Sequence, residues 1–254
     1  MTIDIQGLIE QRPHLKDPLE LYAGWQRFQH QITELLPREE SAPPAESRAY
    51  PPDSVGPILR LFASVFDLPE EALAPLARTL EGGAIDFMRL PLDELPELSL
   101  PYDDKELASI LFLLSRSYFL ALRKACPQDG RQWKNGRCPL CSARSALASI
   151  TEGPQRRLHC SYCGTIGPYL FMGCPNCETG DPSKLGTLVA EEEPGFRVAS
   201  CDECRTYVKV VEASLLGEMT ADLADMASLP LDIIAQEKGY LRKAPNPIGL
   251  KNMR

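Results

Sequence analysis

The chain has 254 residues, of which 44% are hydrophobic and 24% are charged, and these values are ordinary for a water-soluble globular protein. This length is enough for one large domain or two smaller ones, each with its own core. No apolar run approaches the roughly 20 residues that a membrane-spanning helix needs, and residues 1–10 lack the basic start of a secretory signal. We therefore expect a cytoplasmic protein without membrane insertion.

The formal charge of −8 is distributed unevenly along the chain. Residues 1–130 carry 12 Lys and Arg against 21 Asp and Glu. A general nucleic-acid-binding protein usually presents a basic face, so this balance argues against nucleic acid as a partner.

The first half of the sequence predicts helices. Between residues 17 and 36, apolar residues recur every three or four positions, as they do on one face of an amphipathic helix. These apolar residues are Leu21, Trp25, Phe28, Ile32 and Leu35. We expect further helices at 54–66, with Ser54 as its N-cap, at 69–80 and at 103–125, where the nearly all-apolar centre predicts burial.

The second half of the sequence predicts short strands and one last helix. Runs of β-branched and apolar residues alternate with Gly and Pro turns. The expected strands are 147–151, 186–189, 197–200 and 207–211. A helix is expected at 221–237, and Pro230 should kink or split it because proline removes a helical hydrogen bond.

All nine cysteines lie between Cys126 and Cys204, and eight of them form four Cys-x-x-Cys pairs. In a reduced cytoplasm such a density indicates metal binding rather than disulfides. A two-residue spacing lets a tight turn aim both sulfurs at one point, and two such turns make a tetrahedral four-sulfur site. The eight expected ligands are Cys138, Cys141, Cys160, Cys163, Cys174, Cys177, Cys201 and Cys204.

The spacing between pairs favours two sequential sites, the first two pairs on one ion and the last two on another. Eighteen residues separate Cys141 from Cys160, and 23 separate Cys177 from Cys201, and each gap suits a short hairpin. A cross-braced pairing stays open as an alternative. Four thiolates suit zinc or iron. Thiol redox catalysis is a weaker alternative, because a redox pair normally opens a helix after a strand. A closed four-cysteine site also leaves no coordination position for a substrate.

Several segments resemble the FdhE family, accessory proteins of formate dehydrogenase. His-Cys-Ser-Tyr-Cys at 159–163 is similar to the second cysteine knuckle of that family. Ser-Cys-Asp-Glu-Cys-Arg-Thr-Tyr-Val-Lys at 200–209 resembles the fourth knuckle and the strand after it. The segment 225–232 resembles the family's Asp-Leu-Ala-Ser-Leu-x-Leu-Asp, and Asn246-Pro247 matches a pair near its end. The resemblance covers 138–247.

The resemblance implies an α+β protein in which an N-terminal helical bundle precedes two tandem rubredoxin-like or zinc-ribbon modules and a C-terminal helix. Combined with the sequence pattern, it predicts a helical domain at 1–130, a first four-cysteine module at 131–170, a second at 171–215, and a helix and tail at 216–254. It also implies a non-enzymatic protein that holds two metal ions, iron or zinc.

The resemblance further implies that the protein binds the catalytic subunit of a respiratory molybdenum- or tungsten-dependent formate dehydrogenase during maturation. We expect the second knuckle and the last helix to form the docking surface, through polar residues beside the metal site, with Lys209 facing solvent between two valines. These residues are Arg205, Tyr207, Lys209, Asp225 and Asp232. Two other functions compete: a zinc-ribbon protein associated with nucleic acid or transcription, and a rubredoxin-like electron carrier, which would require iron.

Overall fold

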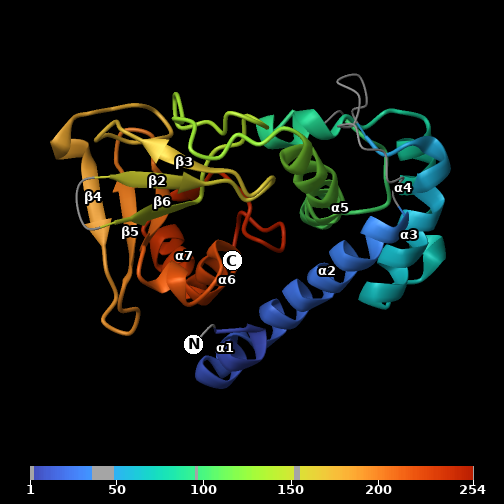
Figure 1. Ribbon diagram of the computed structural model, residues 1–254, viewed down its shortest axis with the longest axis horizontal. Coiled ribbons are helices and arrows are strands. Elements are labelled where there is room, and N and C mark those ends of the chain that lie inside the picture. The colour runs from blue at the N-terminus through green and yellow to red at the C-terminus, as the bar shows by residue number, and fades with distance from the viewer. Residues whose placement is uncertain (1–2, 36–48, 95–96, 152–154, 254) are drawn as a thin grey trace.

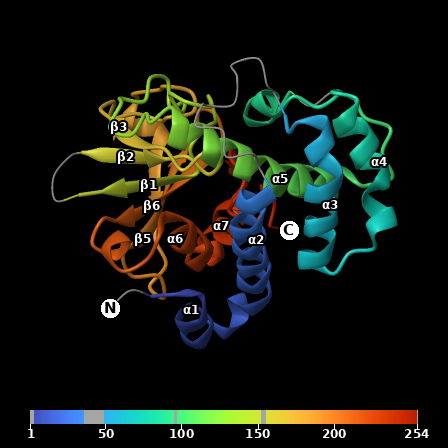
Figure 2. The same ribbon diagram turned by 45° about the vertical axis from the view of Figure 1, so that its right-hand side comes forward.

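The computed structural model describes residues 3–35, 49–94, 97–151 and 155–253 (Figure 1). The N-terminal helices form one half of the molecule, and a twisted sheet with two short C-terminal helices packed against it forms the other, as expected for an α+β protein (Figures 1 and 2). The α-helices are α1 (Ile5–Gln11), α2 (Lys16–Leu35), α3 (Pro52–Phe66), α4 (Glu70–Glu81), α5 (Asp104–Ala125), α6 (Ala221–Ala227) and α7 (Leu229–Glu237). Short 3-10 helices are η1 (Pro13–Leu15), η2 (Phe87–Leu92), η3 (Pro182–Lys184) and η4 (Leu215–Gly217). The strands are β1 (Leu147–Ile150), β2 (Arg156–His159), β3 (Ile166–Tyr169), β4 (Leu185–Leu188), β5 (Phe196–Cys201), β6 (Thr206–Glu212) and β7 (Leu241–Arg242).

The long helix α2 buries a stripe that differs at both ends from the predicted one. Leu21 and Leu35 are exposed, so their assignment to the buried face was wrong. The buried apolar side chains of the helix are Leu19, Tyr22, Trp25, Phe28 and Ile32. Because Leu19 and Tyr22 continue the three-to-four spacing as well as Leu21 does, the pattern alone did not separate the two choices.

Helix α3 begins at Pro52, two residues before the predicted N-cap Ser54. Pro51 precedes it in an extended conformation, and Pro52 occupies the first turn. Proline fits there because an N–H group in the first turn has no hydrogen-bond partner within the helix. Helix α5 begins as expected. The Asp103 side chain accepts a hydrogen bond from the backbone N–H of Glu106, and the Glu106 side chain accepts one from the backbone N–H of Asp103. This capping box fixes the start of the helix that carries much of the helical core.

The strands form one sheet in the order β3-β2-β1-β6-β5-β4, with β7 beside β6. The strands β1, β2 and β3 are joined by antiparallel pairing, as are β4, β5 and β6. The two halves meet where β1 runs parallel to β6 and Leu147 lies opposite Lys209. Two hairpin units therefore lie side by side in one sheet, and their division into separate domains stays a prediction.

Strands β2 and β3 were missed by sequence analysis. The strand β2 reads Arg-Arg-Leu-His and β3 reads Ile-Gly-Pro-Tyr, so neither has the β-branched composition that marks a strand. Pro168 is tolerated because β3 is an edge strand. Pairing of β2 with β1 and of β3 with β2, rather than local preference, makes both segments extended.

The C-terminal segment forms two short helices that pack under the sheet. Helix α6 ends at Ala227, and Pro230 lies in the first turn of α7, so the predicted helix is split as expected. Thr220 caps α6 by accepting from the backbone of Leu223. No helix in the described part of the chain combines the length and apolar character needed to cross a membrane.

Candidate metal centres

Each Cys-x-x-Cys pair forms a tight turn that ends in a left-handed residue directly after the second cysteine. These four residues are Ser142 (φ 61°), Gly164 (φ 70°), Glu178 (φ 61°) and Arg205 (φ 53°). In the first three turns the N–H of this residue donates to the carbonyl of the first cysteine of the pair, at 2.9 to 3.0 Å. The four turns thus share one backbone design, although only one of them carries the glycine that a left-handed position favours.

The first centre brings together Cys138, Cys141, Cys160 and Cys163, all of them buried. The Sγ atoms of Cys138 and Cys163 are 3.5 Å apart, those of Cys141 and Cys160 3.4 Å, and those of Cys141 and Cys163 3.7 Å. The knuckle of Cys138 and Cys141 precedes β1, and that of Cys160 and Cys163 connects β2 to β3.

The second centre brings together Cys174, Cys177, Cys201 and Cys204. The Sγ atoms of Cys174 and Cys204 are 3.7 Å apart, as are those of Cys177 and Cys201. Cys177 is exposed and Cys204 is partly exposed, so this centre meets solvent while the first does not. The cysteines are therefore grouped sequentially, and the cross-braced arrangement is not formed.

Both quartets fit a tetrahedral metal ion. Thiolates bound at about 2.3 Å at the corners of a tetrahedron lie about 3.8 Å apart, slightly more than the distances found here. The two four-cysteine groups could thus hold one ion each with little movement. Zinc and iron have similar bonds to sulfur, so this geometry does not distinguish them.

The buried cysteines also need a bound cation if they are to be thiolates. Burial raises the pKa of Cys141 and Cys160 well above that of an ordinary thiol. Burial likewise raises the pKa of Cys174 to about 12. Four thiolates in so small a volume need a bound positive charge, because burial and mutual repulsion both favour the neutral thiol.

A threonine hydroxyl contacts one sulfur in each centre at matching positions. Thr165 Oγ1 lies 3.2 Å from the Sγ of Cys163, and Thr206 Oγ1 lies 3.0 Å from the Sγ of Cys204. When the sulfur is a thiolate, the hydroxyl is the donor. In the second centre Asn176 Nδ2 also donates to Thr206 Oγ1 at 2.9 Å, which orients the hydroxyl. Sequence analysis missed both threonines, although each stands two residues after the second cysteine of its pair.

Most of the residues expected to form a docking surface are buried in the interior of the protein. Arg205 is exposed, but Tyr207, Lys209, Asp225 and Asp232 are buried, and Lys209 has 0% exposure. The prediction that Lys209 faces solvent was therefore wrong. The strand β6 is central in the sheet and α6 and α7 cover one of its faces, so alternation with valines does not mark a solvent side. That these residues bind a partner stays a prediction. It assumed that their side chains are exposed, and four of the five are not.

The four buried residues form a charge cluster together with Arg242, which sequence analysis missed. Lys209 Nζ lies 2.7 Å from Asp225 and 2.5 Å from Asp232. Arg242 pairs with the same two carboxylates at 2.5 and 2.7 Å, and Tyr207 donates to Asp232 at 2.6 Å. Each buried charge thus has two opposite partners, which ties α6 and α7 to β6 and β7.

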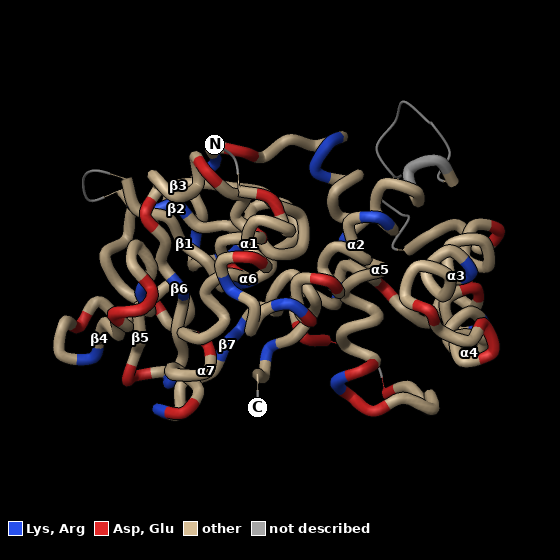
Figure 3. The backbone as a smooth tube through the Cα atoms, turned by 90° about the horizontal axis from the view of Figure 1, so that it is seen from below, with Lys and Arg blue, Asp and Glu red and all other residues tan. Residues whose placement is uncertain are grey.

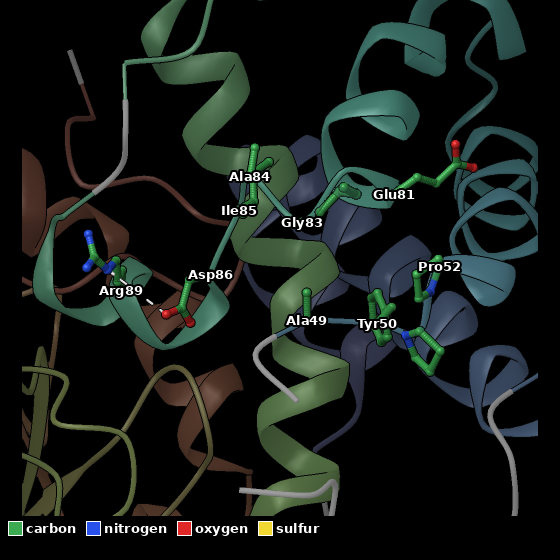
Figure 4. A pocket seen from close by; sticks show the side chains of 11 residues that line it. Ala49, Tyr50, Pro52, Glu81, Gly83, Ala84, Ile85, Asp86 and Arg89 are labelled. Atoms are coloured by element: carbon green, nitrogen blue, oxygen red, sulfur yellow. Dashed lines mark ion pairs between the residues drawn. The ribbon is translucent and has the colours of Figure 1, made fainter. Parts of the chain in front are cut away.

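An open hollow of about 460 Å³ lies in the helical half (Figure 4). Its wall carries an ion pair between Arg89 and Asp86 at 4.0 Å. Tyr50 also lines it but donates its hydroxyl to the carbonyl of Leu114. The lining residues include no cysteine or histidine, so the candidate chemistry of the described chain lies in the two cysteine centres.

Comparison with known proteins agrees with this arrangement. The family model described as the FdhE C-terminal domain matches residues 172–248. Protein FdhE of Escherichia coli is 27% identical over 199 residues, 77% of this chain and 60% of that protein. A Protein FdhE homolog of Aquifex aeolicus is 29% identical over 125 residues, 48% of this chain and 44% of that protein. The alignments thus span less than two thirds of these curated relatives.

A solved structure has the same fold. The crystal structure of the FdhE protein from Pseudomonas aeruginosa superposes with a TM-score of 0.67 at 22% identity. The superposition covers 96% of this chain and 92% of that one. The shared architecture therefore includes the helical half as well as the sheet.

Proposed function

The chain belongs to the FdhE family, and from this membership we propose that it is an accessory protein for the maturation of formate dehydrogenase. We further infer that it binds the catalytic subunit of a respiratory molybdenum- or tungsten-dependent enzyme. The observation that carries the proposal is the presence, in one chain, of the FdhE-like helical half and of two complete cysteine quartets.

The structure of the two centres supports a non-enzymatic role. Each quartet uses all four tetrahedral positions for protein sulfur, so a bound ion would have no open position for substrate or water. The first centre is also closed to solvent, because its four cysteines are all buried. Centres of this kind stabilise a fold and shape a surface, which is what an accessory protein needs.

The eight cysteines would hold two ions, iron or zinc. Either ion would link two knuckles covalently and so fix the ends of the hairpins, and iron would also supply a one-electron couple. The chain's own contribution is to place four sulfurs per centre and to donate Thr165 and Thr206 hydroxyls to them. Metal analysis of the purified protein, together with its visible absorption, identifies the ion.

The proposed function is tested by complementation. A strain that lacks this gene should lose formate-dependent dye reduction, and the wild-type gene should restore it. The purified catalytic subunit of formate dehydrogenase should bind the wild-type protein directly, as measured by biolayer interferometry. Full activity without the gene, together with no binding to the subunit, would contradict the proposal.

A second candidate function is electron transfer, which the exposure of Cys177 favours. A sulfur ligand that reaches solvent brings the metal of a rubredoxin-like centre close to a redox partner. This function requires iron in the second centre. It predicts visible absorption that bleaches on reduction and returns on oxidation, and a colourless protein with two zinc ions would exclude it.

A further inference from the structure

One face of the strands β4, β5 and β6 is not covered by the C-terminal helices. In β6, Tyr207 and Lys209 point to α6 and α7, where they contact Asp232 and Asp225. Neighbouring residues of a strand point to opposite faces, so Thr206 and Val208 face the other way. Their partners in β5 are Cys201 and Ala199.

A groove of about 190 Å³ lies on this second face, beside the second cysteine centre, although Thr206 and Val208 themselves are buried. It is lined by β2, the loop around Met172, β4, β5 and β6. The lining includes Arg156, Met172, Asn176, Thr187, Ala199 and Val208. The groove is large enough for a single apolar side chain and is open to solvent.

An apolar loop stands at the rim of the groove. Leu170, Phe171 and Met172 have exposed fractions of 61%, 44% and 76%. The loop is held in place, because Arg156 Nη2 donates to the carbonyl oxygens of Phe171 at 3.1 Å and of Gly173 at 2.7 Å. Three consecutive exposed apolar residues on a fixed loop are unusual on a protein surface and are typical of an interaction site. Methionine is well suited to such a site because its side chain adapts to its partner.

The strand β4 forms the free edge of the sheet next to this groove (Figure 1). It pairs with β5 on one side, and its other side offers backbone N–H and C=O groups to a further strand. An extended polypeptide that added to β4 would direct alternate side chains towards the groove.

The chain on either side of β4 is rich in acidic residues, with few basic ones among them (Figure 3). Residues 178–203 contain seven Asp and Glu but only Lys184 and Arg197 as bases. Only Glu193 and Asp202 among these acids form an ion pair with a described residue. The other five are Glu178, Asp181, Glu191, Glu192 and Glu203. Four thiolates around a divalent ion would add a further net charge of about −2 at the same end of the strand.

We propose that this surface binds one extended, basic segment of a partner polypeptide. The segment lies along β4, places an apolar side chain in the groove against Met172, and directs Lys or Arg side chains at the acidic residues on either side. The identification of this partner as the catalytic subunit of formate dehydrogenase rests on the proposed function. The surface itself follows from the groove, the free edge and the charge.

The experiment uses two ligands with the full-length protein. The first is the purified catalytic subunit, and the second is a synthetic peptide of eight alternating Lys and Leu residues, with an alternating Glu and Leu peptide as its control. Affinities are measured by interferometry, and the site of peptide binding is mapped by NMR on the ¹⁵N-labelled protein. The Lys peptide should bind, shift the amide signals of Met172 and 185–188, and dissociate as salt is raised. The Glu peptide should not bind.

Matched variants separate the surface from general effects of charge and exposure. We expect Met172→Glu to weaken binding of the Lys peptide and of the subunit at least tenfold. Its control is Leu241→Glu, since Leu241 is also 59% exposed but lies in β7. The pair Glu178→Lys and Glu203→Lys should weaken both by a similar factor. Its control is the reversal of Glu20 and Glu237, two exposed acids outside this surface. Native mass spectrometry should find the same metal content in every variant.

The outcomes distinguish the two proposals. If the Lys peptide binds at β4 but the wild-type protein does not bind the subunit, the surface stands and the proposed partner is wrong. If the subunit binds equally to wild type and to Met172→Glu and the double reversal, the proposed function stands and the surface is wrong. Failure of the Lys peptide to bind, or amide shifts elsewhere on the protein, also overturns the surface.

Discussion

Gly136 lies directly against Pro175, and this contact joins the region before the first knuckle to the first knuckle of the second centre. A Cβ atom built on Gly136 would be 1.8 Å from the carbonyl oxygen of Pro175. Arg144 reinforces the contact, since its Nη1 donates to the same carbonyl at 2.9 Å and to that of Asn135 at 2.6 Å. The two centres are thus fixed relative to one another by backbone contact as well as by the shared sheet.

Gly136→Ala should therefore destabilise the protein by more than the cost of its backbone conformation. A left-handed residue with a side chain costs about 1–2 kcal/mol, and the contact with Pro175 adds to that cost. Gly83→Ala is the control, because Gly83 is also left-handed but a Cβ there meets open space. Chemical denaturation should show a clearly larger loss for Gly136→Ala than for Gly83→Ala, and equal losses would show that the contact with Pro175 is easily relieved.

The left-handed turn after each cysteine pair leads to a second prediction, at Ser142. This residue has φ of 61° and is exposed, so its side chain can be changed without loss of a core contact. Ser142→Ala should be less stable than Ser142→Gly by about 1 kcal/mol, because glycine adopts this conformation without strain. The measurement is thermal unfolding of the metal-loaded variants. A glycine variant less stable than the alanine variant would contradict the argument.

The buried cluster around Lys209 gives a third prediction. Lys209→Met leaves Asp225 and Asp232 with Arg242 as their only cationic partner, and removing one member of a buried charge group typically costs about 3–5 kcal/mol. The double change Lys209→Met with Asp232→Leu removes one charge of each sign and should recover part of this loss. Urea unfolding of the two variants measures the difference, and a double variant less stable than Lys209→Met would contradict this account.

The same cluster predicts a loss of stability in acid. Burial opposes ionisation of Asp225, but Arg242 and Lys209 outweigh it and hold the pKa of its carboxyl below the usual value. The unfolded chain therefore binds a proton at a higher pH than the folded protein does. The contribution of Asp225 is complete above about pH 5 and falls as the pH drops through the pKa of the unfolded group, about 3.9, towards that of the folded protein. Asp225→Asn should flatten the dependence of unfolding free energy on pH between about 5 and 3, and an unchanged slope would show that other carboxyls control it.

The cysteine centres could be predicted from sequence because each knuckle is local. Two residues between cysteines define the turn, and the hairpin-sized gaps define which pairs meet, as the grouping of Cys141 with Cys160 shows. The surroundings of Lys209 could not be predicted in this way. Its contacts come from α6, α7 and β7, and β6 is buried on both faces, so its sequence carries no sign of which side is solvent. The parallel pairing of β1 with β6 has the same origin, because it joins segments about 60 residues apart.

The difference in exposure between the two centres predicts the order in which they lose metal. The second centre reaches solvent through Cys177, whereas the cysteines of the first are buried in one continuous core with Trp133 and Tyr162. A chelator or thiol reagent must reach a sulfur to displace the ion, so the second centre should release its ion first. We expect native mass spectrometry during chelation to pass through a species with one ion. Alkylation mapped by peptide mass spectrometry should then modify Cys177 and Cys204 well before Cys138 and Cys163. The variant Cys177→Ser should bind a single ion that resists the chelator, whereas Cys138→Ser should bind a single ion that does not. Release of both ions at one rate, or early alkylation of Cys163, would show that the centres open together and that burial does not control metal loss.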